Sequence, residues 1–156
     1  MIAVDIPGLR TLRLEHLVLD YNGTLAEDGK LLPGVAAMLG ALARTLQIHV
    51  VTADTFGSAA EELSGLPVDL VIVPDAAQAD SKLEFITRLN ADSVVAVGNG
   101  RNDWKMLEAA ALGIALVQRE GGAVETLRCA DIAATAIVDA LALLQCPKRL
   151  IATLRS

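Results

Sequence analysis

The sequence is poor in aromatic residues and contains no long hydrophobic segment. Aromatic residues make up 3% of the 156 residues, which leaves little material for stacking on nucleic-acid bases. Hydrophobic residues reach 53%. They form short runs interrupted by Asp, Gly and Pro, none of which approaches the roughly 20 apolar residues that a membrane-spanning helix needs. We therefore expect neither a nucleic-acid-binding protein nor a membrane protein.

Cysteine and histidine are also scarce. Cys129 and Cys146 lie in apolar surroundings and lack the paired spacing of a metal site, so we expect two reduced structural thiols. His16 and His49 lie at the starts of predicted strands, and we expect them to be structural rather than catalytic. The N-terminus shows no charged region followed by an apolar core and a cleavage site, which predicts no secretory signal and a cytoplasmic location.

The net charge of −6 disfavours a polyanionic partner. It still allows a small phosphorylated substrate whose charge is balanced by a cation and one lysine. A chain of 156 residues is long enough for one domain that buries about two thirds of its unfolded surface. We expect a single domain over residues 1–156.

Short β-branched runs alternate with helical patterns, which predicts an α/β, three-layer, Rossmann-like domain with a central parallel sheet. The predicted strands are 16–20, 48–52, 69–73, 93–98, 113–117 and 131–134. The predicted helices are 34–46, 55–64, 78–90, 102–111, 121–129 and 136–144, with a last amphipathic segment from Pro147. An Asp-Gly pair within residues 25–32 predicts a small hairpin.

The segment Asp20-Tyr21-Asn22-Gly23-Thr24 directly follows the first predicted strand. Ligands collect at the carboxyl ends of parallel strands, so we expect Asp20 to face a crevice. Gly23 permits a sharp turn, and Thr24 adds a hydroxyl and an N–H to the same small volume. Ordinary turn chemistry without a function is the alternative.

Polar residues also follow later elements. Thr52 ends the second strand, and the helix expected to start at Thr55 offers free N–H groups to an anion; helix capping is the alternative. Lys82 lies near the start of a helix, where a solvated surface lysine is the alternative. Residues 98–103 follow the fourth strand with two glycines and three polar side chains. They lack the third glycine of a dinucleotide-binding loop, which also belongs after the first strand.

Residues 20–24, Thr52, Lys82 and residues 98–103 resemble, in this order along the chain, the motifs of the haloacid dehalogenase superfamily of aspartyl phosphotransferases and phosphatases. Asp20–Thr24 is similar to its Asp-x-Asp-Gly-Thr, and residues 98–103, Gly-Asn-Gly-Arg-Asn-Asp, are similar to its Gly-Asp-Gly-x-Asn-Asp. Thr52 and Lys82 stand at its threonine and single basic positions. Residues 98–103 and 110–115 together resemble the phosphorylation domain of P-type ATPases, and the chain resembles the soluble P-type-ATPase-like proteins of prokaryotes.

The resemblance implies a Mg²⁺-dependent phosphohydrolase with an aspartyl-phosphate intermediate. Asp20 would be the nucleophile, and Lys82 would balance its charge and that of the phosphoryl group. The resemblance assigns Mg²⁺ to the Asp20 carboxylate, the backbone carbonyl of Asn22 and the side chain of Asn99, with Asp103 nearby. It assigns the phosphoryl oxygens to Gly23, Thr52, Ala53, Lys82 and Asn102.

Two positions depart from that pattern. Asn22 stands where the phosphatases carry the Asp that acts as general acid and base, and an amide cannot shuttle a proton. Asn99 replaces a metal-binding Asp, which predicts weaker Mg²⁺ binding. We expect a slow phosphatase. A phospho-acceptor or regulatory module that does not turn over, and a nucleotide-binding domain without covalent chemistry, are the alternatives.

The spacing of the motifs leaves no room for a cap domain. The hairpin and one helix take up the chain from Asp20 to Thr52, and one helix, one strand and a turn take up the chain from Thr52 to Lys82. We therefore expect an open site that needs a large substrate, a neighbouring subunit in a homo-oligomer, or tolerance of water. The expected partner is a phosphorylated small molecule or protein, and the hairpin at 25–32 is a flap that can reach a neighbouring subunit.

Overall fold

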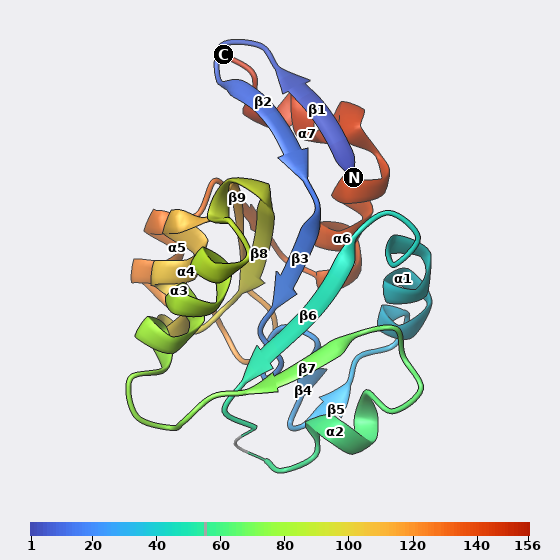
Figure 1. Ribbon diagram of the computed structural model, residues 1–156, viewed down its shortest axis with the longest axis vertical. Coiled ribbons are helices and arrows are strands. Elements are labelled where there is room, and N and C mark those ends of the chain that lie inside the picture. Colours follow the sequence, from blue (N-terminus) through green and yellow to red (C-terminus); the bar gives the residue numbers. More distant parts are fainter. Residues whose placement is uncertain (55) are drawn as a thin grey trace.

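The computed structural model describes residues 1–54 and 56–156. A six-stranded parallel sheet forms the middle layer, in the order β10-β9-β8-β3-β6-β7 (Figure 1). Its strands are β3 (His16–Leu19), β6 (Gln47–Thr52), β7 (Asp69–Ile72), β8 (Val94–Gly98), β9 (Leu112–Leu116) and β10 (Ile132–Ala134). All six predicted strands are present, and the predicted fold class is confirmed.

Helices cover both faces of this sheet. α1 (Val35–Leu42) and α6 (Ile137–Gln145) lie on one face, and α3 (Gln78–Arg88), α4 (Trp104–Ala109) and α5 (Val124–Cys129) lie on the other (Figure 1). Leu39 and Leu141 belong to the first core, whereas Ile86 and Met106 belong to the second. Buried residues on both sides of the central strands are typical of a parallel sheet between two helical layers. No helix in the described chain has the length and apolar character needed to cross a membrane.

The hairpin predicted at 25–32 consists of β4 (Ala26–Glu27) and β5 (Lys30–Leu31). The hydroxyls of Tyr21 and Ser58 both donate to the carbonyl of Gly29 at its tip, at 2.9 and 2.8 Å. Between Asp20 and Lys82 the described chain otherwise contains only α1, β6, α2 (Ala59–Glu62), β7 and the first residues of α3. No cap domain is inserted in that part of the described chain.

Helix α2 is shorter than the predicted helix at 55–64. Asp54 has a positive φ of 55°, and its carboxylate accepts the N–H of Ala59 at 3.0 Å. The chain therefore turns after β6 before the helix begins at Ala59. The expected helix start at Thr55 lies outside the described residues.

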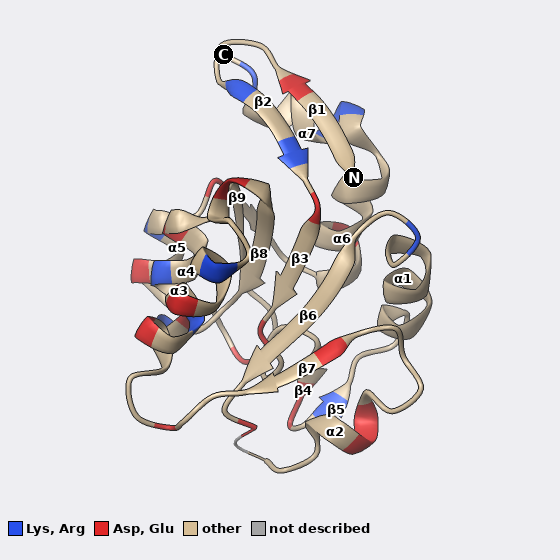
Figure 2. Ribbon diagram, viewed as in Figure 1, with Lys and Arg blue, Asp and Glu red and all other residues tan. Residues whose placement is uncertain are grey.

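An N-terminal hairpin was not among the predicted elements. β1 (Ile2–Ile6) pairs antiparallel with β2 (Arg10–Leu14), and β1 packs against α7 (Pro147–Leu154) (Figure 1). The two strands and α7 form a lobe at the end of the sheet where β3 begins. The lobe is predominantly basic (Figure 2). It lies away from the carboxyl ends of the strands.

Candidate active site

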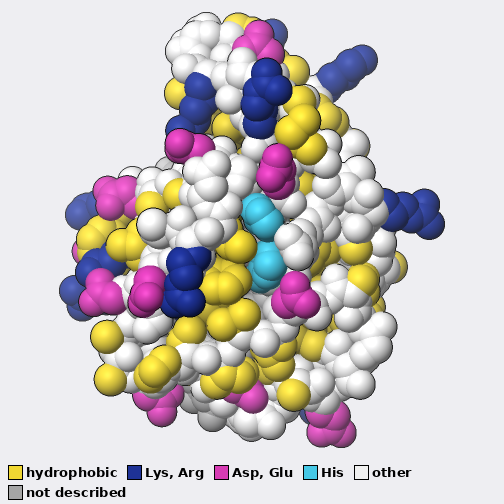
Figure 3. Space-filling view, in the orientation of Figure 1, with side chains coloured by type: hydrophobic (Ala, Val, Ile, Leu, Met, Phe, Trp, Pro, Cys, Tyr) yellow, Lys and Arg dark blue, Asp and Glu magenta, His cyan; other side chains and the backbone are white. Residues whose placement is uncertain are grey.

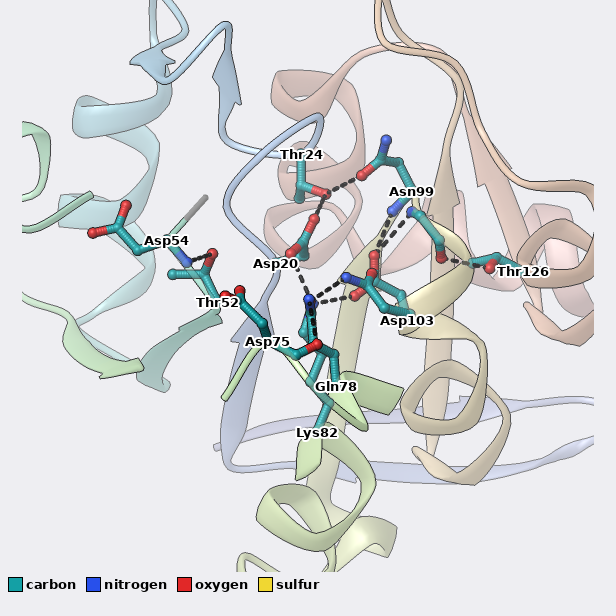
Figure 4. A network of polar contacts seen from close by, with 12 residues as sticks. Asp20, Thr24, Thr52, Asp54, Asp75, Gln78, Lys82, Asn99, Asp103 and Thr126 are labelled. Atoms are coloured by element: carbon teal, nitrogen blue, oxygen red, sulfur yellow. Dashed lines mark hydrogen bonds and ion pairs between the residues drawn. The ribbon is translucent and has the colours of Figure 1, made fainter. Parts of the chain in front are cut away.

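The predicted site residues gather at the carboxyl edge of the sheet. Asp20 directly follows β3, Thr52 ends β6 and Asn99 directly follows β8. Because β3 lies between β6 and β8, these three strand ends are neighbours. Lys82 reaches the same place from α3, and Asp103 from the short helix η2 (Arg101–Asp103) (Figure 4).

Lys82 lies between two carboxylates. Its Nζ is 2.8 Å from Asp20 Oδ1 and 2.7 Å from Asp103 Oδ1. The residue is 1% exposed, so Lys82 is not a solvated surface lysine. Asp20 and Asp103 are buried as well. The three formal charges sum to −1, and such a buried cluster favours a further positive charge beside it.

The ammonium that Asp20 shares with Asp103 does not offset the effect of burial on the pKa of Asp20. Burial raises the pKa of Asp20 to about 6; the charge of Asp103 adds to this effect, and Lys82 opposes it. Burial alone would lower the pKa of Lys82, but the two carboxylates together outweigh it and raise that pKa. Lys82 is therefore the fixed cation of the cluster, whereas burial disfavours the charged form of Asp20.

Asp103 is held by the protein through both carboxylate oxygens. Oδ1 accepts from Lys82, and Oδ2 accepts the N–H groups of Asn99 and Gly100, both at 3.0 Å. A Cβ at Gly98 would overlap the carboxyl group of Asp103, so this close approach requires glycine. These bonds favour Asp103 as a support for Lys82 and for the 98–103 loop. Its predicted role as a metal ligand stays a prediction.

Oxygens of Asp20 and Asn99 face the same small volume. The Thr24 hydroxyl lies 3.3 Å from Asp20 Oδ2 and 3.4 Å from Asn99 Oδ1 (Figure 4). Asn99 Nδ2 donates to the Gly121 carbonyl at 3.1 Å, which turns Oδ1 of the same amide toward Thr24. Gly23 has a φ of 78°, and a Cβ there would clash with the Asn99 side chain. Glycine thus lets the loop after Asp20 approach Asn99.

This donor set fits a hard cation such as Mg²⁺. It offers the Asp20 carboxylate and the Asn99 amide oxygen beside a buried cluster of net charge −1, and Mg²⁺ prefers oxygen ligands with retained waters. Among the described residues, no group of three or more His, Cys, Asp or Glu side chains is arranged to hold a metal. A cation here would therefore depend on an amide oxygen and on the predicted backbone carbonyl of Asn22.

The predicted phosphate-binding residues differ in what they already bind. Thr52 Oγ1 accepts the Asp54 N–H at 2.9 Å, which leaves the hydroxyl hydrogen for another acceptor, and Ala53 lies in the same turn. The Gly23 N–H donates to the Ala26 carbonyl at 2.9 Å. Asn102 Nδ2 donates to Gln78 Oε1 at 2.5 Å. In this structure Thr52 is therefore better placed to bind a phosphoryl group than Gly23 or Asn102.

Asn22 has an unsatisfied amide oxygen. Its Oδ1 is the only buried side-chain nitrogen or oxygen without a hydrogen-bond partner in the part of the chain that the structure describes. Leaving such an atom unpaired costs about 1–3 kcal/mol, so it calls for an explanation. This unpaired amide oxygen lies two residues after Asp20, the predicted nucleophile.

Gln118 was not among the predicted site residues, although it fixes the loop that follows Asp20. Its Nε2 donates to the carbonyls of Gly23 and Thr24 at 3.1 and 3.0 Å, and its Oε1 accepts the Ile137 N–H at 2.8 Å. A cavity of about 220 Å³ lies beside it, lined by Gly23, Ala26, Glu27, Leu32, Gln118, Arg119, Glu120 and Thr135. Asp20 is not in this lining, so the cavity adjoins the cluster and is not its centre.

Solved structures share this architecture. The chain is similar to a protein from Legionella pneumophila assigned to the HAD superfamily, subfamily III A, with a TM-score of 0.72 and 14% identity over 90% of this chain and 86% of that chain. It is also similar to the cobalt-bound deoxy-D-mannose-octulosonate 8-phosphate phosphatase of Haemophilus influenzae, with a TM-score of 0.71 and 8% identity over 92% and 94% of the two chains. The chain has the haloacid dehalogenase (HAD) fold.

A third structure with the HAD fold is 3-deoxy-D-manno-octulosonate 8-phosphate phosphatase from Moraxella catarrhalis, in complex with a magnesium ion, a phosphate ion and a KDO molecule. Its TM-score is 0.66, with 17% identity over 90% of this chain and 92% of that chain. At such identities the likeness shows the HAD fold alone.

In sequence, the chain is 38% identical over 79 residues to the uncharacterized protein MJ0073 of Methanocaldococcus jannaschii, covering 48% of this chain and 85% of MJ0073. The two proteins belong to one family. No family model matches the chain.

Proposed function

We propose that this HAD-fold protein is a Mg²⁺-dependent phosphatase that forms an aspartyl-phosphate on Asp20 and hydrolyses it slowly. The main support is the buried cluster of Asp20, Lys82 and Asp103, which places a carboxylate against a fixed ammonium at the carboxyl edge of the sheet. A nucleophile held beside a cation suits attack on a phosphorus that carries negative charge. Phosphatases among the solved structures of similar fold support the same reaction class.

In the first step, an oxygen of Asp20 attacks the phosphorus, and the bond from phosphorus to the leaving-group oxygen breaks. Protonated Lys82 balances the charge of Asp20 before the attack and that of the phosphoryl group after it. The Thr52 hydroxyl and the backbone of Ala53 orient the phosphoryl oxygens. Mg²⁺, when bound by Asp20, Asn22 and Asn99, would neutralise charge on those oxygens.

In the second step, water attacks the phosphorus of the aspartyl-phosphate, and the Asp20 carboxylate and inorganic phosphate are released. A general acid normally gives the leaving group its proton, and the same group then takes a proton from water. Asn22 can do neither, which forfeits about 10²- to 10⁴-fold in rate. Acyl and aryl phosphates, whose leaving groups need little protonation, are therefore the best substrates.

Charge around the site narrows the substrate class. Acidic residues prevail on the elements near the carboxyl edge (Figure 2); they include Glu27, Asp28, Asp54, Glu61, Glu62 and Asp75. Polyanions such as nucleic acids would be repelled, whereas a phosphorylated small molecule or a phosphorylated protein carries one anionic group to the buried lysine. A large substrate or a second subunit would cover a site that has no cap. The resemblance to P-type ATPases stays a prediction, as does the cytoplasmic location.

A phospho-acceptor or regulatory module is the second candidate. Asn22 favours it because the aspartyl-phosphate lacks the group that would activate water, and Asn99 favours it because a neutral ligand weakens the metal site. Such a module would accept a phosphoryl group on Asp20 and keep it. The two candidates differ in the lifetime of the aspartyl-phosphate.

The Asn22→Asp variant tests the proposal. Because Oδ1 of Asn22 is buried without a donor, a carboxyl group at this position would have a raised pKa and could protonate a leaving group. We expect hydrolysis of an alkyl phosphate, a poor leaving group, to rise by about 10²-fold or more, with a smaller gain for aryl phosphates. The burst of product release by the natural protein should shrink in the variant, since its aspartyl-phosphate is hydrolysed faster.

The matched control is Asp20→Asn, which should abolish turnover in both the natural and the Asn22→Asp background. Circular dichroism establishes that each variant is folded, and Mg²⁺ titration establishes that Asn22→Asp still binds metal. If folded, metal-binding Asn22→Asp is no faster on any substrate, Asn22 does not stand in for the acid. The phospho-acceptor candidate then replaces the phosphatase.

A further inference from the structure

Both histidines of the chain lie side by side at the other end of the sheet. His16 begins β3, whereas Asp20 follows the end of that strand. His49 lies in β6 opposite Val18, so His16 and His49 share the face of the sheet that α3 covers. Figure 3 shows the two side chains in contact at the surface of the molecule. Neither histidine takes part in the proposed phosphatase reaction.

The two rings present nitrogens to each other. His16 Nδ1 is 3.2 Å from His49 Nε2, and the other ring nitrogen of His49, Nδ1, is 3.6 Å from Asp69 Oδ2. A proton on Nδ1 facing Asp69 leaves the lone pair of Nε2 directed toward His16. The 3.6 Å separation is that of an ion pair rather than a hydrogen bond, and a small shift of the exposed Asp69 side chain would give the carboxylate–histidine hydrogen bond that commonly orients metal-binding imidazoles. The ring of Phe85 on α3 packs edge-to-face against the His49 ring, with 5.3 Å between the ring centroids, and this contact restricts rotation of the His49 ring.

We propose that His16 Nδ1 and His49 Nε2 form a binding site for a transition-metal dication, with Zn²⁺ as the first candidate. With Zn–N bonds of about 2.0–2.1 Å, two ligand nitrogens of a tetrahedral site lie about 3.4 Å apart. The 3.2 Å separation in this structure is close to that value. The hydrogen between the two nitrogens passes to Nε2 of His16 or to solvent when the metal binds. Two paired strands carry the ligands, so little rearrangement is needed.

The ligand chemistry separates this site from the one around Asp20. Imidazole nitrogens favour Zn²⁺, Cu²⁺ and Ni²⁺, whereas the oxygens of Asp20 and Asn99 favour Mg²⁺. Among the described residues no third His, Cys, Asp or Glu side chain joins the two histidines in a metal-binding group. Water completes the coordination. The bound ion would tie β3 to β6 and stabilise the folded state.

The test uses tag-free protein in which Cys129 and Cys146, both free thiols, are replaced by serine, with Mg²⁺ in excess. Competition with a chromophoric chelator measures the affinity for Zn²⁺. We expect one equivalent of Zn²⁺ to bind, and the affinity to fall at least about tenfold in His16→Gln and in His49→Gln. Asp69→Asn should weaken binding by about 10- to 100-fold through the orientation of His49, whereas Asp92→Asn, at an exposed carboxylate, should leave it unchanged.

Equal Zn²⁺ affinity in the natural protein and both histidine variants would overturn the site. So would the absence of binding at about a tenfold molar excess of Zn²⁺, because the two rings then share only a hydrogen bond. If the variants fail to fold, the natural protein still decides the question. Stoichiometric Zn²⁺ must shift the imidazole ¹⁵N resonances of His16 Nδ1 and His49 Nε2, and unchanged resonances refute the proposal.

Discussion

Replacing Asp20 by asparagine should stabilise the metal-free protein, and increasingly so as the pH rises. Burial raises the pKa of Asp20 from 3.8 to about 6, so the folded state binds more protons than the unfolded state between these values. The free energy of unfolding therefore falls as the pH rises through this window. This rise in the pKa of Asp20 corresponds to about 3 kcal/mol of unfolding free energy. An asparagine does not titrate and avoids this loss.

Urea unfolding in EDTA, at several pH values from about 4 to 7, measures the effect. The stability of Asp20→Asn relative to the natural protein should increase by about 3 kcal/mol across this range. Asp92→Asn, at an exposed carboxylate, is the matched control and should show a difference that does not change by more than about 0.5 kcal/mol. A pH-independent difference for Asp20→Asn, or one of opposite sign, would show that Lys82 outweighs both burial and Asp103. Asp20 would then be an ordinary stabilising partner of an ion pair.

Three further predictions concern neighbouring residues. Asn99→Asp should tighten Mg²⁺ binding in a calorimetric titration because it adds a charge beside Asp20, and an equal or weaker affinity would remove Asn99 from the ligand set. Lys82→Met should abolish turnover. It should also lower the free energy of unfolding at neutral pH by about 3–5 kcal/mol, because two buried carboxylates lose their cation. A loss below about 1 kcal/mol in urea unfolding would contradict the observed burial of the cluster. Gln118→Glu should lower the free energy of unfolding by about 2–4 kcal/mol, because the carbonyls of Gly23 and Thr24 lose their donor. Gln47→Glu, at an exposed strand position, should change it little. Equal effects of the two variants in urea unfolding would show that Gln118 does not fix the loop after Asp20.

The central sheet could be predicted from sequence because its strands are buried on both faces. Such strands appear as short continuous apolar runs, and all six runs became strands. The ends of helices were less predictable. For example, α2 begins at Ala59, whose N–H donates to the Asp54 carboxylate, and this contact depends on the turn that precedes the helix. The sequence does contain a pattern typical of the β1–β2 hairpin: apolar and polar side chains alternate on both sides of the turn residues Pro7 and Gly8. Its packing partner α7 lies at the far end of the sequence.

Motif order was sufficient to predict that Lys82 lies near Asp20. Asp20 follows the end of β3, and Lys82 lies near the start of α3, the helix that follows β7, so both lie toward the carboxyl edge of the parallel sheet. Motif order could not predict that Asp103 is held by the 98–103 loop, or that Asn102 binds Gln78, because these contacts depend on side-chain positions within loops. Gln118 carries no local signal at all. Its role comes from the packing of the loop after β9 against the loop after β3.

The position of β3 between β6 and β8 also sets the order in which the protein can fold. Its pairing with β6 joins segments closer in sequence than its pairing with β8, so closing the second loop costs more chain entropy. The Lys82–Asp20 contact spans 62 residues and the Thr24–Asn99 contact spans 75. Such long-range contacts slow folding, and the Thr24–Asn99 contact forms only after β8 has paired with β3. During synthesis, Asp20 therefore emerges early, Lys82 follows when about half of the chain has been made, and Asn99 follows only when nearly two thirds of the chain is available.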